Sequence, residues 1–259
     1  GTVLVFGVGI GDLVAAVLVA NPEATVIAWD RDPAMMRLAL SGQDYSQWMT
    51  DGRLVWALGE EIFDFQDQKP DHVIDHPMLS QVYIHERRLL ELDSGAPRVL
   101  MCAGGLFIDD VADCFEKSGM AVYTWDVSTQ SEASLAATAR RVSPDFVFAI
   151  NYTQGLAEAC DDLEIPLLVW EIDPSTDGLR PAGCLTDHVR IHTYRAANVD
   201  RFRAAGFSHV HYTPLAANTE RRTPSSDAQR KGPEVCFVGA SMVDQAMHFR
   251  HLFLDTWCH

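Results

Sequence analysis

Basic residues are scarce in this sequence. It holds 20 Lys and Arg against 36 Asp and Glu, which gives a formal net charge of −16. A protein that binds nucleic acid neutralises phosphates with a basic surface, and an anionic membrane attracts the same kind of surface. The charge therefore argues against nucleic acid and against a membrane surface as partners.

Cysteine is also sparse and carries no recognisable motif. The six cysteines are scattered and none stands in a CxxC pair. Most lie inside apolar runs, where Cys behaves as a small hydrophobic residue. This pattern does not fit a disulfide-stapled scaffold, and we expect a reducing, cytoplasmic compartment.

Several motifs of catalysis and targeting are missing. There is no Walker A loop and no G-x-S-x-G turn, which argues against nucleoside-triphosphate hydrolysis and a serine nucleophile. His72 and His76 have no third ligand near them in the sequence, so no metal site is predicted. The apolar run 3–20 carries one charge, Asp12, and no basic segment precedes it. It predicts a buried strand, a turn and a helix, and no transmembrane segment or signal peptide.

What the sequence does have is a regular alternation of short β-type runs and helical patterns, which is typical of parallel sheets with crossover helices. Strands are predicted at 2–6, 25–29, 53–58, 72–76, 98–103, 121–125, 145–150, 166–172, 188–194 and 209–215. Helices are predicted at 12–20, 33–40, 80–92, 108–118, 132–141, 154–163 and 196–205. The fold class predicted is α/β.

Turn-forming residues divide this alternation. The cluster DSGAP at 93–97 interrupts it, and a polar, Pro-containing stretch follows at 218–234. We therefore predict one Rossmann-like unit at 1–93 and a second at 94–218. Residues 219–259 would be a linker and the first strand and helix of a third unit.

The sharpest local motif is FGVGIGD at 6–12, which follows a predicted strand and opens a helix. Gly7, Gly9 and Gly11 would allow a tight turn and the close approach of a ligand to a helix N-terminus. Asp30 ends the next strand, where a carboxylate can accept hydrogen bonds from ribose hydroxyls. These four residues predict a nucleoside site. In the alternative interpretation the glycines only let strand and helix pack closely.

The spacing of these glycines resembles one nucleotide family more than another. Asp12 stands where G-x-G-x-x-G requires its last glycine, whereas G-x-G-x-G resembles the first motif of class I S-adenosylmethionine methyltransferases. DGRLVWALGE at 51–60 resembles their third-strand region, and the segment is also similar to the nucleotide fold of motility accessory factor proteins. The resemblance implies S-adenosylmethionine as a ligand. Val5 replaces the acid usual in those methyltransferases, which favours a non-catalytic binding or scaffold module over methyl transfer.

Five stretches of the second part share a further pattern: RVLMCAGG (98–105), SPDFVFAIN (143–151), IPLLVWEIDP (165–174), the run 193–218 and EVCFVGAS (234–241). Through them, residues 98–241 resemble the CgeB-like (spore maturation) group of GT-B glycosyltransferases. It implies transfer of a sugar from a nucleotide-sugar donor to a glycan or protein acceptor. Only the opening of the second, donor-binding GT-B domain is matched, so the resemblance implies a truncated GT-B arrangement whose donor site is not in this chain.

Polar residues and glycines follow the predicted strands of this part directly. Ligands of open α/β sheets bind beyond the carboxyl ends of the strands. This predicts substrate contacts at Gly104, Gly105, Asn151 and Gly239. Glu171 and Asp173 lie two residues apart at a strand end, where one carboxylate could take the proton of a sugar acceptor. In the alternative interpretation Asp173 only caps the turn before Pro174.

Overall fold

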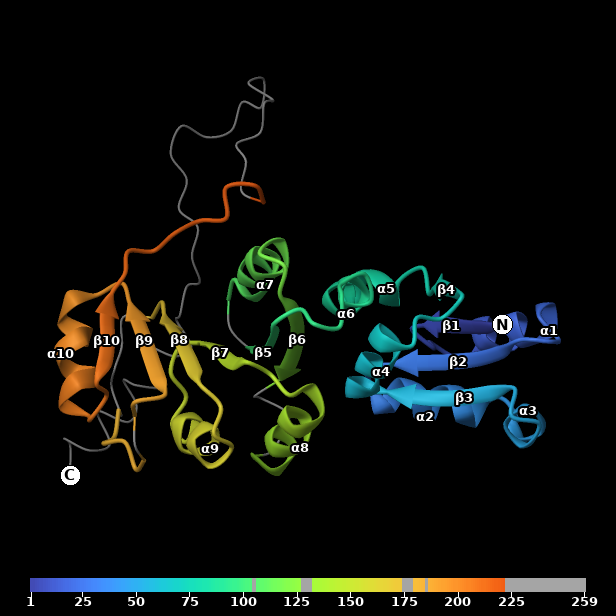
Figure 1. Ribbon diagram of the computed structural model, residues 1–259, viewed down its shortest axis with the longest axis horizontal. Coiled ribbons are helices and arrows are strands. Elements are labelled where there is room, and N and C mark those ends of the chain that lie inside the picture. Colours follow the sequence, from blue (N-terminus) through green and yellow to red (C-terminus); the bar gives the residue numbers. More distant parts are fainter. Residues whose placement is uncertain (104–105, 127–131, 174–178, 185, 222–259) are drawn as a thin grey trace, which may run out of the picture. The chain divides into compact units, whose positions relative to one another are not determined.

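The computed structural model describes residues 1–103, 106–126, 132–173, 179–184 and 186–221. Residues Gly1–Arg221 form one compact unit. Strands and helices alternate along it and build two parallel sheets, which confirms the predicted α/β class (Figure 1). The strand and helix predicted after residue 219, at 234–241 and 243–257, lie outside the described residues. In the described part of the chain, every helix is too short or too polar to span a bilayer.

The first sheet has four parallel strands in the order β3-β2-β1-β4. Its strands are β1 (Thr2–Phe6), β2 (Thr25–Asp30), β3 (Leu54–Leu58) and β4 (His72–Asp75). The helices of this part are α1 (Asp12–Ala20), α2 (Pro33–Gly42), α3 (Ser46–Thr50), η1 (Gly59–Glu61), α4 (Ile62–Asp67), α5 (Leu79–Val82) and α6 (Ile84–Leu89). The order reverses between β1 and β4, which makes the carboxyl ends of these two strands a topological switch point.

The second sheet has six parallel strands in the order β10-β9-β8-β7-β5-β6. Its strands are β5 (Arg98–Ala103), β6 (Ala121–Asp126), β7 (Phe146–Ile150), β8 (Leu167–Glu171), β9 (Val189–Thr193) and β10 (His209–Tyr212). Its helices are α7 (Ile108–Lys117), α8 (Glu132–Val142), α9 (Leu156–Asp162) and α10 (Ala196–Ala204). This is the flavodoxin-like order, and its switch point lies between β5 and β7.

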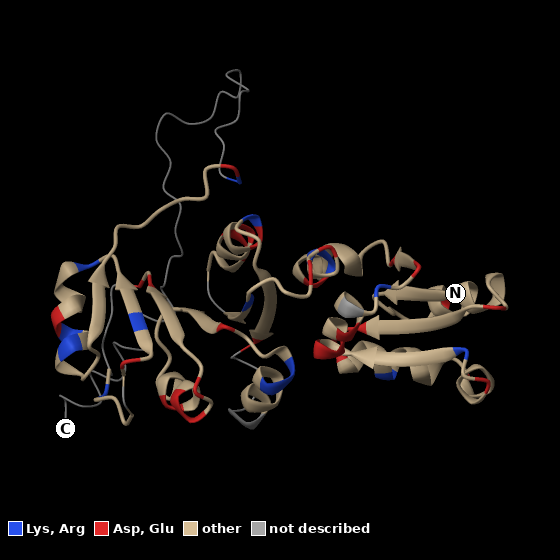
Figure 2. Cartoon of the chain, in the orientation of Figure 1, with Lys and Arg blue, Asp and Glu red and all other residues tan. Residues whose placement is uncertain are grey.

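The two faces of the second sheet are covered unequally. Residues of α8, α9 and α10 join the core cluster on one face, whereas on the other face α7 packs on β5, β6 and β7. Strand β7 is therefore almost wholly buried, while β8 and β9 alternate between buried and partly exposed residues. Acidic residues gather on α9 and basic residues on α8 and α10 (Figure 2).

Two local differences from the sequence prediction have physical causes. The helix predicted at 80–92 is broken at Tyr83, whose ring lies edge-on to Phe6 and Trp29 and whose hydroxyl bonds Asp30. A long-range contact therefore fixes the break. The short helices α3, η1 and α4 were not predicted, because runs of three to six residues show no clear helical period.

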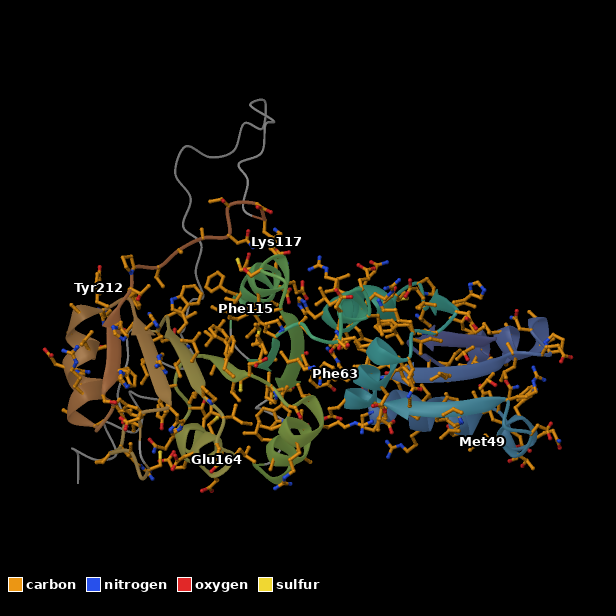
Figure 3. The ribbon with its side chains drawn as sticks, viewed as in Figure 1. Met49, Phe63, Phe115, Lys117, Glu164 and Tyr212 are labelled. Atoms are coloured by element: carbon orange, nitrogen blue, oxygen red, sulfur yellow. The ribbon has the colours of Figure 1, made fainter. Side chains whose placement is uncertain are left out.

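One hydrophobic core serves both sheets. Its largest cluster contains Phe6 and Trp29 from the first sheet together with Leu100 and Tyr123 from the second. Phe63 of α4, labelled in Figure 3, connects them: its ring centroid lies 5.7 Å from that of Tyr123, and the guanidinium of Arg98 lies 4.6 Å above its ring. The relative placement of the two sheets in this unit therefore depends on aromatic packing around α4.

A partly buried ion pair adds a polar link beside this core. Nη1 of Arg31, which follows β2, lies 3.0 Å from Oε1 of Glu86 in α6 and 3.3 Å from the hydroxyl oxygen of Thr124 in β6. The Glu86 side chain is fully buried. Because an unpaired buried carboxylate is costly, Glu86 holds Arg31 in place.

If the core is shared, losing the Phe63 ring should weaken both sheets together. We expect Phe63→Ala to lower the free energy of unfolding by about 3–5 kcal/mol. Amide hydrogen exchange should show loss of protection by the same factor in β1 and in β7. Val19→Ala, at a 71% exposed position of α1, is the control and should change little. Loss of protection confined to the first sheet would mean that the sheets unfold separately.

Candidate functional site

The glycine turn after β1 requires glycine for its backbone. Gly7, Gly9 and Gly11 have φ values of +83°, +60° and +96°, which L-residues with side chains adopt only with strain. Gly11 is the N-cap of α1. The turn therefore has the tight geometry that the motif predicts.

The protein's own side chains occupy the space beside this turn. A Cβ atom on Gly9 would lie 2.6 Å from Nε2 of His76, and one on Gly7 would lie 2.8 Å from Cβ of Leu79. Tyr45 packs against Gly11, the third glycine of the turn, and its hydroxyl donates a 2.9 Å hydrogen bond to the Gly11 carbonyl. The close approach that glycine allows is thus used for packing, and the predicted nucleoside contact stays a prediction.

The His76 ring is fixed by the segment that follows β4. Its Nδ1 accepts hydrogen bonds from the backbone N–H groups of Met78 and Leu79, at 3.3 and 3.2 Å. The neutral ring then carries its proton on Nε2, the atom that faces Gly9. The switch point of the first sheet is therefore closed by an oriented imidazole.

Asp30 lies at this turn, as predicted, and its side chain is fully buried. One carboxylate oxygen accepts the Val8 N–H at 2.8 Å, and the other accepts the Asp32 N–H and the Tyr83 hydroxyl at 3.0 Å each. Burial and the Asp30 charge raise the pKa of Tyr83 above its ordinary value, so its hydroxyl stays protonated and donates. In this structure the Asp30 carboxylate therefore accepts its hydrogen bonds from groups of the protein itself.

The predicted residues of the second sheet meet at the carboxyl ends of β7 and β8. Asn151 has a φ of +62°, and its amide oxygen accepts the backbone N–H groups of Ile172 and Asp173 at 2.9 and 3.1 Å. Its amide nitrogen donates a 2.7 Å hydrogen bond to Oδ2 of Asp173. Glu171 accepts the backbone N–H of Tyr152. The structure therefore brings together Asn151, Glu171 and Asp173.

The two carboxylates of this group differ in environment. Asp173 is exposed, and its Oδ1 has no hydrogen-bond partner among the described residues, whereas Glu171 is only 4% exposed. Burial raises the pKa of Glu171 and the Asp173 charge adds to this, while the Tyr152 N–H opposes it. Asp173 can therefore reach a substrate, and Glu171 holds the backbone.

Asn151 also marks the switch point of the second sheet. It begins the loop after β7, the neighbour of β5 at the point where the strand order reverses. In α/β proteins ligands bind in the crevice at such a point. The predicted contacts Gly104 and Gly105, which follow β5, and Gly239 lie outside the described residues.

One further cavity was not predicted from the sequence. A cleft of about 1100 Å³ lies where β2, β3, β5 and β6 end, with residues 81–85 on its wall. Arg31 and His85 line it. No spacing in the sequence indicates that α6 packs beside β6, so the sequence carries no signal that predicts this cleft. In the described part of the chain, no group of three or more His, Cys, Asp or Glu is arranged to hold a metal.

Comparison with known proteins gave no relative: no family model, no curated protein and no solved structure matches this chain.

The contact between Gly9 and His76 can be tested by stability. We expect Gly9→Ala to cost roughly 1–4 kcal/mol of unfolding free energy, from the left-handed backbone and from overlap with the imidazole. Adding His76→Ala should restore part of this loss in urea unfolding, since it removes the overlap. A double variant no more stable than Gly9→Ala alone would show that His76 does not crowd the turn.

The environment of Glu171 predicts a pH dependence. A carboxyl whose pKa is higher in the folded than in the unfolded protein stabilises the fold while protonated, and that contribution is lost as the pH rises through the folded pKa. Glu171→Gln cannot ionise but can still accept the Tyr152 N–H.

The Tm of Glu171→Gln relative to the parent should therefore rise between pH 5 and pH 8, by on the order of 1–3 °C. Glu23→Gln, at an exposed position, is the matched control and should show no such trend. A relative Tm that falls as the pH rises would mean that the fold favours ionised Glu171.

Proposed function

We propose that this chain is the acceptor side of a glycosyltransferase-like protein of GT-B type, which transfers a sugar from a nucleotide-sugar donor to a glycan or protein acceptor. One observation carries the proposal: the exposed Asp173 carboxylate is oriented by Asn151 beside the switch point of the second sheet. The resemblance of residues 98–241 to the CgeB-like group supports the same assignment.

Asp173 has the attributes of a general base for such a transfer. Oδ2 is held by the Asn151 amide, which leaves Oδ1 for the hydroxyl of an acceptor. Oδ1 would take the hydroxyl proton while the acceptor oxygen bonds to the anomeric carbon of the donor sugar. The bond from that carbon to the nucleoside diphosphate breaks, and the diphosphate leaves with its electron pair.

In this scheme Asn151 and Glu171 are positioning residues: they hold the backbone around Asp173 and do not touch the substrate. Asn151 ties the end of β7 to the end of β8 through its bonds to Ile172 and Asp173. Glu171 accepts a hydrogen bond from the backbone N–H of Tyr152, the residue after Asn151. Their role is to hold the carboxylate of Asp173 in register with a substrate bound at the sheet edge.

Methyl transfer has less support. A nucleoside at the glycine turn would need the space that His76 and Tyr45 take, and it would need the carboxylate of Asp30, which is bonded within the fold. Sugar transfer uses an edge whose polar atoms remain accessible, and we therefore favour it.

The proposal is tested with Asp173→Asn in the full-length protein, assayed across uridine and guanosine diphosphate sugars. Loss of a general base should lower kcat by about 10²- to 10⁴-fold. The Tm should change by no more than about 2 °C, because Asn keeps the shape and can accept the Asn151 hydrogen bond. Asp162→Asn, at an exposed position of α9, is the control and should keep full turnover. Unchanged turnover in Asp173→Asn, or no turnover by the parent with any donor, would contradict the proposal.

A further inference from the structure

Helix α7 leaves the outer strands of the second sheet uncovered on its side. It packs over β5, β6 and β7, and its core cluster includes no residue of β9 or β10. On this side β9 and β10 present Arg190, His192, His209 and His211, which are exposed or half-buried and alternate with buried residues. Parallel pairing places His209 beside Arg190 and His211 beside His192. These four neighbouring residues are called the basic face.

The basic face has no carboxylate of its own. None of its four side chains forms an ion pair with an Asp or Glu in the described part of the chain. The rings of His192 and His211 stack with their centroids 5.3 Å apart. Burial lowers the pKa of His192, and the charge of His211 lowers it further. Protonation of both rings sets two positive charges side by side, and an anion bound there would offset their repulsion.

Uncharged groups surround the histidine pair on the neighbouring strands. Leu168 and Trp170 of β8 lie in register with the residues of β9 on this face. Nδ1 of His192 lies 2.8 Å from the hydroxyl oxygen of Thr213, just after β10. Asp173, the proposed general base, follows Trp170 by three residues, a span of roughly 10 Å along an extended chain. A short oligosaccharide can therefore reach from Asp173 to the basic face.

We propose that the acceptor of the sugar transfer is an anionic glycan, whose terminal hydroxyl meets Asp173 while its carboxylates lie on the basic face. The identity of the acceptor rests on the function proposed above, whereas binding to the face can be measured without transfer. Opposite charges on the two partners select such a glycan and fix its register. An acidic sugar carries hydroxyls and a carboxylate on each unit, so one short chain meets both requirements. A carboxylate at the Asp173 end would instead be repelled.

The test is calorimetric titration of the protein, at low salt and without a donor, with a tetrasaccharide of galacturonate at pH 5.5 and at pH 8. The affinity should be about threefold to tenfold higher at pH 5.5, because histidine side chains gain their charge over this range. Maltotetraose, an uncharged chain of the same length, is the matched control and should give no heat. A capped tetraglutamate peptide, with the same number of carboxylates, should bind more weakly than the galacturonate chain.

Two variants locate the glycan on the basic face. Arg190→Gln should weaken the galacturonate chain about twofold to fivefold at both pH values. His211→Gln should reduce the gain in affinity at pH 5.5. Arg37→Gln removes the same charge from an exposed position of α2 and should bind like the parent.

Four outcomes would overturn the proposal: no binding of the galacturonate chain, equal binding of maltotetraose, equal binding of tetraglutamate, or an Arg37→Gln variant as weak as Arg190→Gln. Equal binding of tetraglutamate would indicate an acidic protein as the partner. Binding as expected, together with no transfer to the bound chain from any donor, would contradict the proposed transfer while supporting an anionic glycan on the basic face.

Discussion

The buried carboxylate of Asp30 is the constraint on which the first half of this protein depends. A fully buried charge without partners would be prohibitive, so its three donors must be in place for the fold to form. They come from Val8 in the glycine turn, from Asp32 at the start of α2 and from Tyr83 at the break before α6. Arg31 lies between Asp30 and Asp32, and His85 lies two residues after Tyr83. Fixing these segments therefore also places Arg31 and His85 on the wall of the cleft. A single carboxylate thus links the turn, two helix starts and the cleft.

The two sheets use their switch points differently. In the first sheet the imidazole of His76 fills the space between the ends of β1 and β4, so the glycine geometry stabilises packing. In the second sheet the loop after β7 presents Asn151 and an accessible carboxylate at the corresponding place. The strand ends therefore carry a packed imidazole in one sheet and an exposed carboxylate in the other. The difference depends on which side chain follows the strand, His76 or Asn151.

Features that depend on residues close together in the chain could be predicted from the sequence, and features that depend on distant contacts could not. Strand β1 and helix α1 were predicted to the residue, because their hydrophobic runs and the glycine turn lie within one short stretch. Asn151, Glu171 and Asp173 were each predicted at the carboxyl end of a strand, because ligands of open α/β sheets bind beyond these ends. The break at Tyr83 and the filling of the glycine turn by His76 depend on contacts across more than 50 residues, which no spacing in the sequence reveals. The unequal exposure of Glu171 and Asp173 has a similar origin, because Glu171 accepts a hydrogen bond from the backbone of Tyr152, 19 residues earlier in the chain.

Parallel pairing also governs the order in which the chain can assemble during synthesis. Strand β1 is made before both of its neighbours, and one of them, β4, comes much later: the Thr2 N–H donates to the Asp71 carboxylate across 69 residues. At ribosomal rates of roughly 5–20 residues per second, that edge of β1 waits about 3–14 s for its partner. During this time the apolar strand TVLVF has only β2 and α1 to cover it. In the nascent chain that edge of β1 therefore stays unpaired, and prone to aggregation, until β4 has been made.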